Sequence, residues 1–171
     1  MSSSVEEFIK KAREYVRNFE AWAREYELTD KITADHFGYK CSSAEEFERL
    51  RKLFEEYSDY IYQSIISKRR IDIIKLAFPL ETNCGHLWFL ELSDQKPDGS
   101  QKSGFDHLEF FPIKNSVADL VRYLKDKNVV VVKVERTHHT TYDIALSNNF
   151  KVRIETESLI KKIGREEMGI F

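Results

Sequence analysis

The sequence predicts an α+β fold in which two βαβββ modules form a curved, mostly antiparallel eight-stranded sheet, with an N-terminal helical extension. The first observation is a repeat, because residues 33–92 and residues 105–156 both show the order strand, helix, strand, strand, strand. The second is that the first strand of each copy contains Asp-His followed by a large apolar residue. The third is that the last strand of each copy contains a single glutamate.

The composition favours one globular domain over residues 1–171, because 42% of the residues are hydrophobic and 13% aromatic. A net charge of −2 gives no electrostatic argument for binding nucleic acid. Two cysteines, Cys41 and Cys84, are too few for a disulfide framework. There is no signal-peptide pattern and no apolar run of membrane-spanning length, so we expect a cytoplasmic protein that does not contact membranes.

Residues 1–32 form the expected N-terminal extension, most of it a helix over residues 4–28. The helix should begin at the capping pattern Ser4-Val-Glu-Glu7. Its apolar residues recur at helical spacing and include Phe8, Phe19 and Trp22. We expect this face to pack on the core, rather than to bind a cofactor or a partner.

The first module, residues 33–92, begins with a strand over 33–40. A second capping pattern at Ser43 starts a helix that continues to about Tyr57. Strand-like runs follow at about 64–67, 71–78 and 86–92.

A polar segment with proline and glycine, residues 93–104, reads as a linker between the modules. The second module, residues 105–171, repeats the order of the first and adds a short C-terminal helix. Its expected elements are strand 105–112, helix 116–127, strands 129–135, 141–147 and 150–156, and a helix from about residue 158.

In four of the predicted strands, a His or Glu lies on the face opposite to the apolar side chains. Alternate residues of a strand share a face, so Phe37 lies opposite His36, and Leu108 and Phe110 lie opposite His107. The same alternation separates Trp88, Leu90 and Leu92 from Glu91, and Val152 and Ile154 from Glu155. Helices must cover the apolar face, so the polar residues should line the other, concave face of the sheet.

Two imidazoles and two carboxylates suit a divalent transition metal with open coordination positions. His36, Glu91, His107 and Glu155 are therefore candidate ligands for zinc, nickel, iron(II), cobalt or manganese. Two alternatives stay open: strand histidines are often only hydrogen-bonded, and Glu155 could pair with Arg153 on the same face.

Two further residues are candidates for moving protons. Glu109 lies two residues beyond His107 and should share its face, so an unbound carboxylate there could act as a base. His139 could be a general acid or base, or a partner of a ligand, although turn histidines are often solvated. At most one of His138 and His139 can face the cavity, since adjacent strand residues alternate. His86 falls on the expected helix-facing side and reads as structural.

The paired modules with these polar positions resemble the vicinal oxygen chelate superfamily, which includes glyoxalase I and extradiol dioxygenases. A closer resemblance is to the YecM family, regarded as metal-binding proteins, and it covers nearly the whole chain including the N-terminal helix. The segments that carry it are 33-TADHFGYKC-41, 71-IDIIKLAFP-79, 86-HLWFLELS-93 and 105-FDHLEFFP-112. One departure concerns Glu155, where similar chains tend to have histidine.

The resemblance implies metal positions at His36, Glu91, His107 and Glu155. It also implies a metal-dependent isomerase, lyase or oxygenase acting on a small oxygen-bearing molecule, as a monomer or homodimer. The alternatives are a non-catalytic binding or structural module with a vestigial metal cavity, or a protein that sequesters its ligand without turnover.

Overall fold

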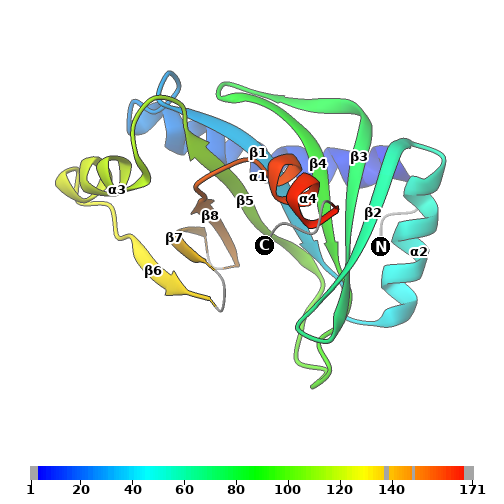
Figure 1. Ribbon diagram of the computed structural model, residues 1–171. Coiled ribbons are helices and arrows are strands. Elements are labelled where there is room, and N and C mark those ends of the chain that lie inside the picture. Colours follow the sequence, from blue (N-terminus) through cyan, green and yellow to red (C-terminus); the bar gives the residue numbers. More distant parts are fainter. Residues whose placement is uncertain (1–3, 137–138, 148, 168–171) are drawn as a thin grey trace.

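The computed structural model describes residues 4–136, 139–147 and 149–167, which form one eight-stranded sheet with helices on both faces (Figure 1). The elements are α1 (Val5–Glu25), β1 (Ile32–Lys40), α2 (Ala44–Glu55), β2 (Ser58–Ile66), β3 (Arg69–Thr82), β4 (Gly85–Ser93), β5 (Gly104–Pro112), α3 (Val117–Asp126), β6 (Val132–Glu135), β7 (Thr140–Ser147), β8 (Phe150–Ile154) and α4 (Leu159–Glu167).

The strand order β2-β3-β4-β1-β5-β8-β7-β6 places the two modules side by side. Strands β1 and β5 pair antiparallel at the centre, and each also pairs parallel with the last strand of its own module. The remaining pairs are antiparallel hairpins. The predicted fold class, two βαβββ modules in a mostly antiparallel sheet behind an N-terminal helix, is therefore confirmed.

Helices α1, α2 and α3 cover one face of the sheet and enclose the main core. Helix α1 buries Phe8, Phe19 and Trp22, as its periodicity predicted. The ring of Phe8 lies 5.0 Å from that of Phe105, and the ring of Trp22 lies 5.7 Å from that of Phe110. Both contacts are with β5, so α1 packs on the centre of the sheet.

The hairpin of β2 and β3 is longer than the runs at 64–67 and 71–78 suggested. Its turn contains Ser67 and Lys68, whose φ angles are 53° and 61°. Two-residue hairpin turns with positive φ usually contain Asn or Gly, so this turn lacks the usual signal. Strand β6 begins at Val132 instead of 129; Val129 is buried in the main core, and its N–H donates to the carbonyl of Leu124 in α3 at 3.0 Å.

The prediction of the apolar face of β4 is wrong for the first half of the strand. Leu90 and Leu92 are buried, but Trp88 is 38% exposed and Leu87 is buried in its place. The pairing of β3 with β4 shifts register between Lys75 and Leu80, which breaks the alternation there. His86 is also exposed and pairs with Glu81, so it does not face the helices.

Helix α4 lies on the opposite face from the other three helices (Figure 1). Its Ile163 is buried against Ile71 and Ile73 of β3, in a small second apolar cluster. Among the described residues, none of the helices has both the length and the apolar character needed to cross a bilayer.

Candidate metal centre

His36 and His107 lie on the two central strands, each beside an aspartate that binds its ring. The Nδ1 atom of His36 is 2.8 Å from Asp35 Oδ2, and that of His107 is 3.0 Å from Asp106 Oδ2. A carboxylate at Nδ1 makes this nitrogen the hydrogen-bond donor. In the neutral form of each ring, the lone pair is then on Nε2, the atom that faces the carboxylates of the cavity.

Local breaks in strand pairing bring each aspartate to its histidine. Opposite β5, Ala34 pairs with Phe110 and His36 with Glu109, so Asp35 is an extra residue. On β5, Phe105 and His107 are paired but Asp106 is not. Such β-bulges redirect a side chain, so the aspartate does not point away from the histidine as simple alternation demands.

Both histidines are buried, with 1% and 4% of their surface exposed. Their rings stand edge to face with centroids 5.8 Å apart. Gly38 makes room for this arrangement, because a Cβ atom there would lie 2.3 Å from Cε1 of His107. The two Nε2 atoms have no hydrogen-bond partner in the part of the chain that the structure describes.

Glu91 lies near both unpartnered nitrogens. Its carboxylate oxygens are 3.9 Å from His36 Nε2 and 4.0 Å from His107 Nε2. One ligand atom from each of the three residues lies within 4.8 Å of the others. Atoms bound to one ion at about 2.0–2.2 Å can be at most about 4.4 Å apart, so the donors need little movement to hold a metal. Two imidazoles and a carboxylate fit a divalent transition metal.

Glu109 is even nearer to the two nitrogens than Glu91. Its oxygens lie 3.5 Å from His36 Nε2 and 3.5 Å from His107 Nε2. Arg153 Nη1 donates a hydrogen bond of 3.0 Å to Glu109, and Arg153 Nε donates one of 2.7 Å to Asp143. The alternative pairing of Arg153 with Glu155 is therefore wrong; the arginine binds Glu109 and Asp143.

The strand register shows which residues correspond in the two modules. In the first module Gly38, two residues beyond His36, pairs with Glu91. In the second module Glu109, two residues beyond His107, pairs with Arg153. The counterpart of Glu91 is therefore Arg153. Glu155 lies two residues beyond that position, so it does not correspond to Glu91 as expected.

Glu155 lies just beyond the end of β8 and is not part of the described group of His36, Glu91 and His107. Its carboxylate is 2.8 Å from Lys162 Nζ of α4 and 3.8 Å from His139 Nε2. His139 is half exposed and lies beside Glu155. His138 lies outside the described residues.

The charges of this centre influence one another strongly. Burial lowers the pKa of His36, but the carboxylates of Glu109, Asp35 and Glu91 outweigh it and raise the pKa to about 9. Burial raises the pKa of Glu109, but His36, His107 and Arg153 outweigh it and hold that pKa well below its usual range. Burial and the charge of Glu109 raise the pKa of Glu155.

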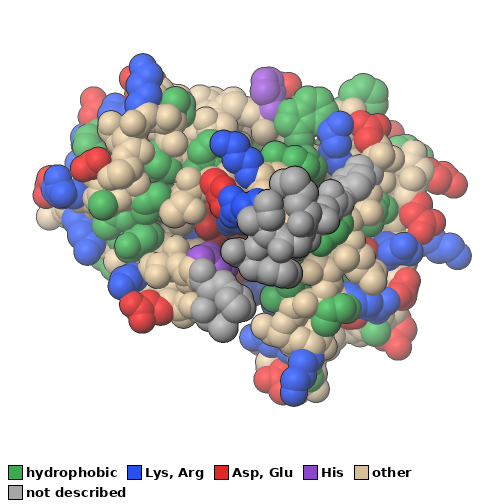
Figure 2. All heavy atoms as spheres, viewed as in Figure 1, with side chains coloured by type: hydrophobic (Ala, Val, Ile, Leu, Met, Phe, Trp, Pro, Cys, Tyr) green, Lys and Arg blue, Asp and Glu red, His purple; other side chains and the backbone are tan. Residues whose placement is uncertain are grey.

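A cavity of about 530 Å³ surrounds these residues and reaches α4. Its lining contains His36, Glu91, His107, Glu109, Arg153 and Glu155, with Lys162 and Ile163 from α4. On the face drawn in Figure 2, acidic, basic and histidine side chains gather in a hollow near the middle of the molecule. The predicted site residues thus border one space, and Glu91 and Glu109 both lie within 4.0 Å of the two histidine Nε2 atoms.

The sequence had signals for several residues of this site that were not identified as part of it. The Asp-His dipeptide occurs in both modules, and its aspartates fix the two rings. The glycine two residues after His36 gives the His107 ring its space. Lys162 had no such signal, because its contact with Glu155 depends on where α4 packs.

One solved structure that aligns with nearly the whole chain supports this architecture. A solved structure described as "Structural Genomics, Protein EC4020" aligns with 17% identity over 96% of this chain and 93% of its own, with a TM-score of 0.75. A Streptomyces coelicolor methylmalonyl-CoA epimerase in complex with 2-nitronate-propionyl-CoA aligns with 13% identity over 73% of this chain and 98% of its own, with a TM-score of 0.46. No curated protein matches the sequence. The family model described as YecM protein matches residues 4–162, and the chain therefore belongs to the YecM family.

Proposed function

We propose that this protein binds one divalent transition metal through His36, Glu91 and His107. The observation that carries the proposal is the pair of buried Nε2 atoms that have no hydrogen-bond partner among the described residues and face Glu91. Buried polar atoms in folded proteins nearly always have a hydrogen-bond partner or another ligand. Two buried nitrogens without one, beside a carboxylate, therefore indicate that a shared ligand binds there. Asp35 and Asp106 fix the tautomer that metal binding needs.

We further propose that the bound metal serves an isomerase, lyase or oxygenase reaction of a small oxygen-bearing molecule. A bound divalent ion supplies Lewis acidity toward the substrate's oxygen atoms. Glu109 is the proposed proton acceptor, because its carboxylate borders the same cavity and is nearer than Glu91 to both histidine Nε2 atoms. His139 is the proposed second proton carrier, at the half-exposed side of that cavity.

We also propose Glu155 as a fourth ligand, which requires that its present ion pair be broken. Its carboxylate pairs with Lys162, so it would have to leave that ammonium group to reach the ion. A metal site completed by Glu155 would therefore involve movement of α4 or of Lys162.

The alternative function is a non-catalytic module that binds a small molecule in a vestigial metal cavity. Arg153 favours it, because a cation occupies the register position that corresponds to Glu91. The same arginine engages Glu109, the carboxylate nearest to both histidines.

Metal stoichiometry tests the proposal. Wild type, His36→Ala, Glu91→Gln and His107→Ala are dialysed with zinc or nickel, freed of excess ion, and assayed for bound metal. We expect about one ion per wild-type chain and little in the three variants. His86→Ala is the matched control, since His86 is exposed and outside the site. Equal, low occupancy in wild type and all variants would contradict the metal site.

A second measurement separates catalysis from binding. Metal-loaded protein is incubated in D₂O with small 2-hydroxy and 2-oxo acids, and deuterium incorporation is followed by NMR. Exchange that Glu109→Gln abolishes, with metal content unchanged, would support Glu109 as proton acceptor. Full metal content without exchange supports the non-catalytic alternative.

A further inference from the structure

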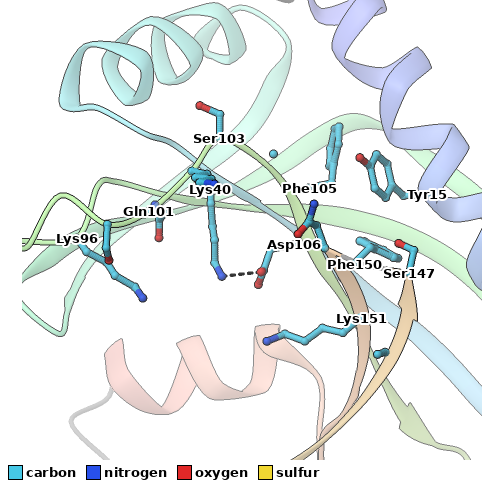
Figure 3. A pocket seen from close by; sticks show the side chains of 15 residues that line it. Tyr15, Lys40, Lys96, Gln101, Ser103, Phe105, Asp106, Ser147, Phe150 and Lys151 are labelled. Atoms are coloured by element: carbon cyan, nitrogen blue, oxygen red, sulfur yellow. Dashed lines mark hydrogen bonds and ion pairs between the residues drawn. The ribbon is translucent and has the colours of Figure 1, made fainter.

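A second cavity, of about 600 Å³, adjoins the candidate metal centre and is bordered by lysines. We call it the lysine pocket and define it by Lys40, Lys96, Lys102 and Lys151, which line it together with Asp106. Figure 3 shows Lys40, Lys96 and Lys151 extending into the same space. Lys40, Lys96, Asp106 and Lys151 also line the cavity of the metal centre, so the two spaces share one wall.

The loop that carries Lys96 is held by hydrogen bonds, two of them buried, although its sequence reads as a polar linker. Gln101 is only 7% exposed, and its amide donates to the carbonyls of Cys41 at 2.7 Å and Asp94 at 2.9 Å. The side-chain oxygen of Gln95 accepts from the backbone N–H groups of Lys96 at 2.7 Å and Gln101 at 3.0 Å. This network fixes the backbone at Lys96 beside the pocket, so the loop lines a preformed cavity.

Positive charge exceeds negative charge in this pocket. Lys40 pairs with Asp106 at 2.5 Å, and Lys151 pairs with Asp143 at 3.1 Å. Within residues 4–136, 139–147 and 149–167, neither Lys96 nor Lys102 forms an ion pair, although the charge of Lys96 helps to lower the pKa of the exposed Asp98. Ammonium groups that converge without enough carboxylates favour an anionic ligand.

Asp106 connects the lysine pocket to the metal centre. One of its oxygens accepts from Lys40 Nζ, and the other lies 3.0 Å from Nδ1 of His107. A molecule in the lysine pocket would therefore lie next to the residue that orients a candidate metal ligand.

We propose that the lysine pocket binds an anionic group of the ligand, a phosphate, phosphonate or carboxylate, while the ligand's oxygen-bearing end reaches the metal centre. The second half of this statement rests on the proposed function. The first half concerns only the lysines, and it can be tested on metal-free protein.

The test is an NMR titration of ¹⁵N-labelled, chelator-treated protein at constant ionic strength. The probes are inorganic phosphate, malonate and uncharged malonamide. We expect saturable shifts of the amides in residues 95–103 and 149–152 with phosphate or malonate, and none with malonamide. Comparing phosphate with malonate shows which kind of anion the pocket prefers.

Variants locate the binding. Surface ion pairs contribute up to about 1 kcal/mol, so Lys96→Gln should weaken anion binding by up to about fivefold. Lys96→Gln/Lys151→Gln should weaken it further, by up to about 25-fold if the two losses add. Lys125→Gln is the matched control, because Lys125 is an exposed lysine of α3 outside the pocket. Circular dichroism and melting temperature verify that each variant is folded.

Three outcomes would overturn the lysine pocket: no saturable shift in wild type, equal shifts with malonamide, or equal affinities in the double variant and Lys125→Gln. Metal stoichiometry is measured separately. Anion binding without stoichiometric metal would leave the lysine pocket standing and refute the proposed metal function. Stoichiometric metal without anion binding would leave the proposed metal function standing and refute the lysine pocket.

Discussion

Gly38 decides how closely the two histidines can approach. Its backbone runs beside the His107 ring, and any Cβ at this position would overlap that ring. We predict that Gly38→Ala displaces His107, costs about 1–3 kcal/mol of unfolding free energy, and reduces bound metal. Denaturant unfolding and metal assays measure the two effects.

Gly164→Ala is the control for that substitution. Gly164 lies within α4, and a Cβ there meets nothing within 4 Å. Alanine should be neutral or slightly stabilising at this helical position. If Gly38→Ala behaves like Gly164→Ala, the close contact between β1 and His107 does not constrain the site.

Arg153 compensates the buried carboxylate of Glu109 and the partly buried carboxylate of Asp143. We predict that Arg153→Met lowers the unfolding free energy by about 1.5–3 kcal/mol, because Glu109 loses a charged hydrogen-bond donor and keeps only the His36 and His107 rings beside it. Glu109→Gln/Arg153→Met should lose less than the sum of the two single variants, since both partners are then neutral. Urea unfolding of the four proteins in a double-mutant cycle measures the coupling. Additive losses would show that the two side chains do not depend on each other.

At the scale of elements, the helices were more predictable than the strands. Ser4 Oγ accepts from the N–H of Glu7, and Ser43 Oγ accepts from that of Glu46, so both helix starts follow local sequence. Strand faces also depend on partners. The register shift after Lys75 exposes Trp88, and the bulges at Asp35 and Asp106 turn these side chains, although no local pattern announces either event.

Helix α1 is a scaffold element, and one of its residues provides a test. Phe19 is fully buried, and its ring lies 6.1 Å from that of Phe110. We predict that Phe19→Ala costs about 3–5 kcal/mol of unfolding free energy. Arg17→Ala, on the exposed side of the same helix, should change it by less than about 0.5 kcal/mol. Equal melting temperatures for these two variants would indicate that α1 does not support the core.

At the scale of the whole molecule, the duplication was readable because each module repeats its order of elements and its Asp-His dipeptide. Three of the proposed ligands, His36, Glu91 and His107, come together as alternation suggested. The fourth position was not predictable in the same way. Which residue of β8 stands opposite Glu109 depends on loop lengths and strand register, and that residue is Arg153.

The pairing of β1 with β5 is the boundary between the two modules, and His36 and His107 stand on opposite sides of it. Neither half of the chain carries both imidazoles. If the exposed loop near Asp98 were cut, each fragment would hold an incomplete donor set, and tight metal binding would require the fragments to reassemble across the β1–β5 boundary. A bound ion would then connect the two fragments of a split protein, and the amount of metal retained would report whether the fragments have reassembled.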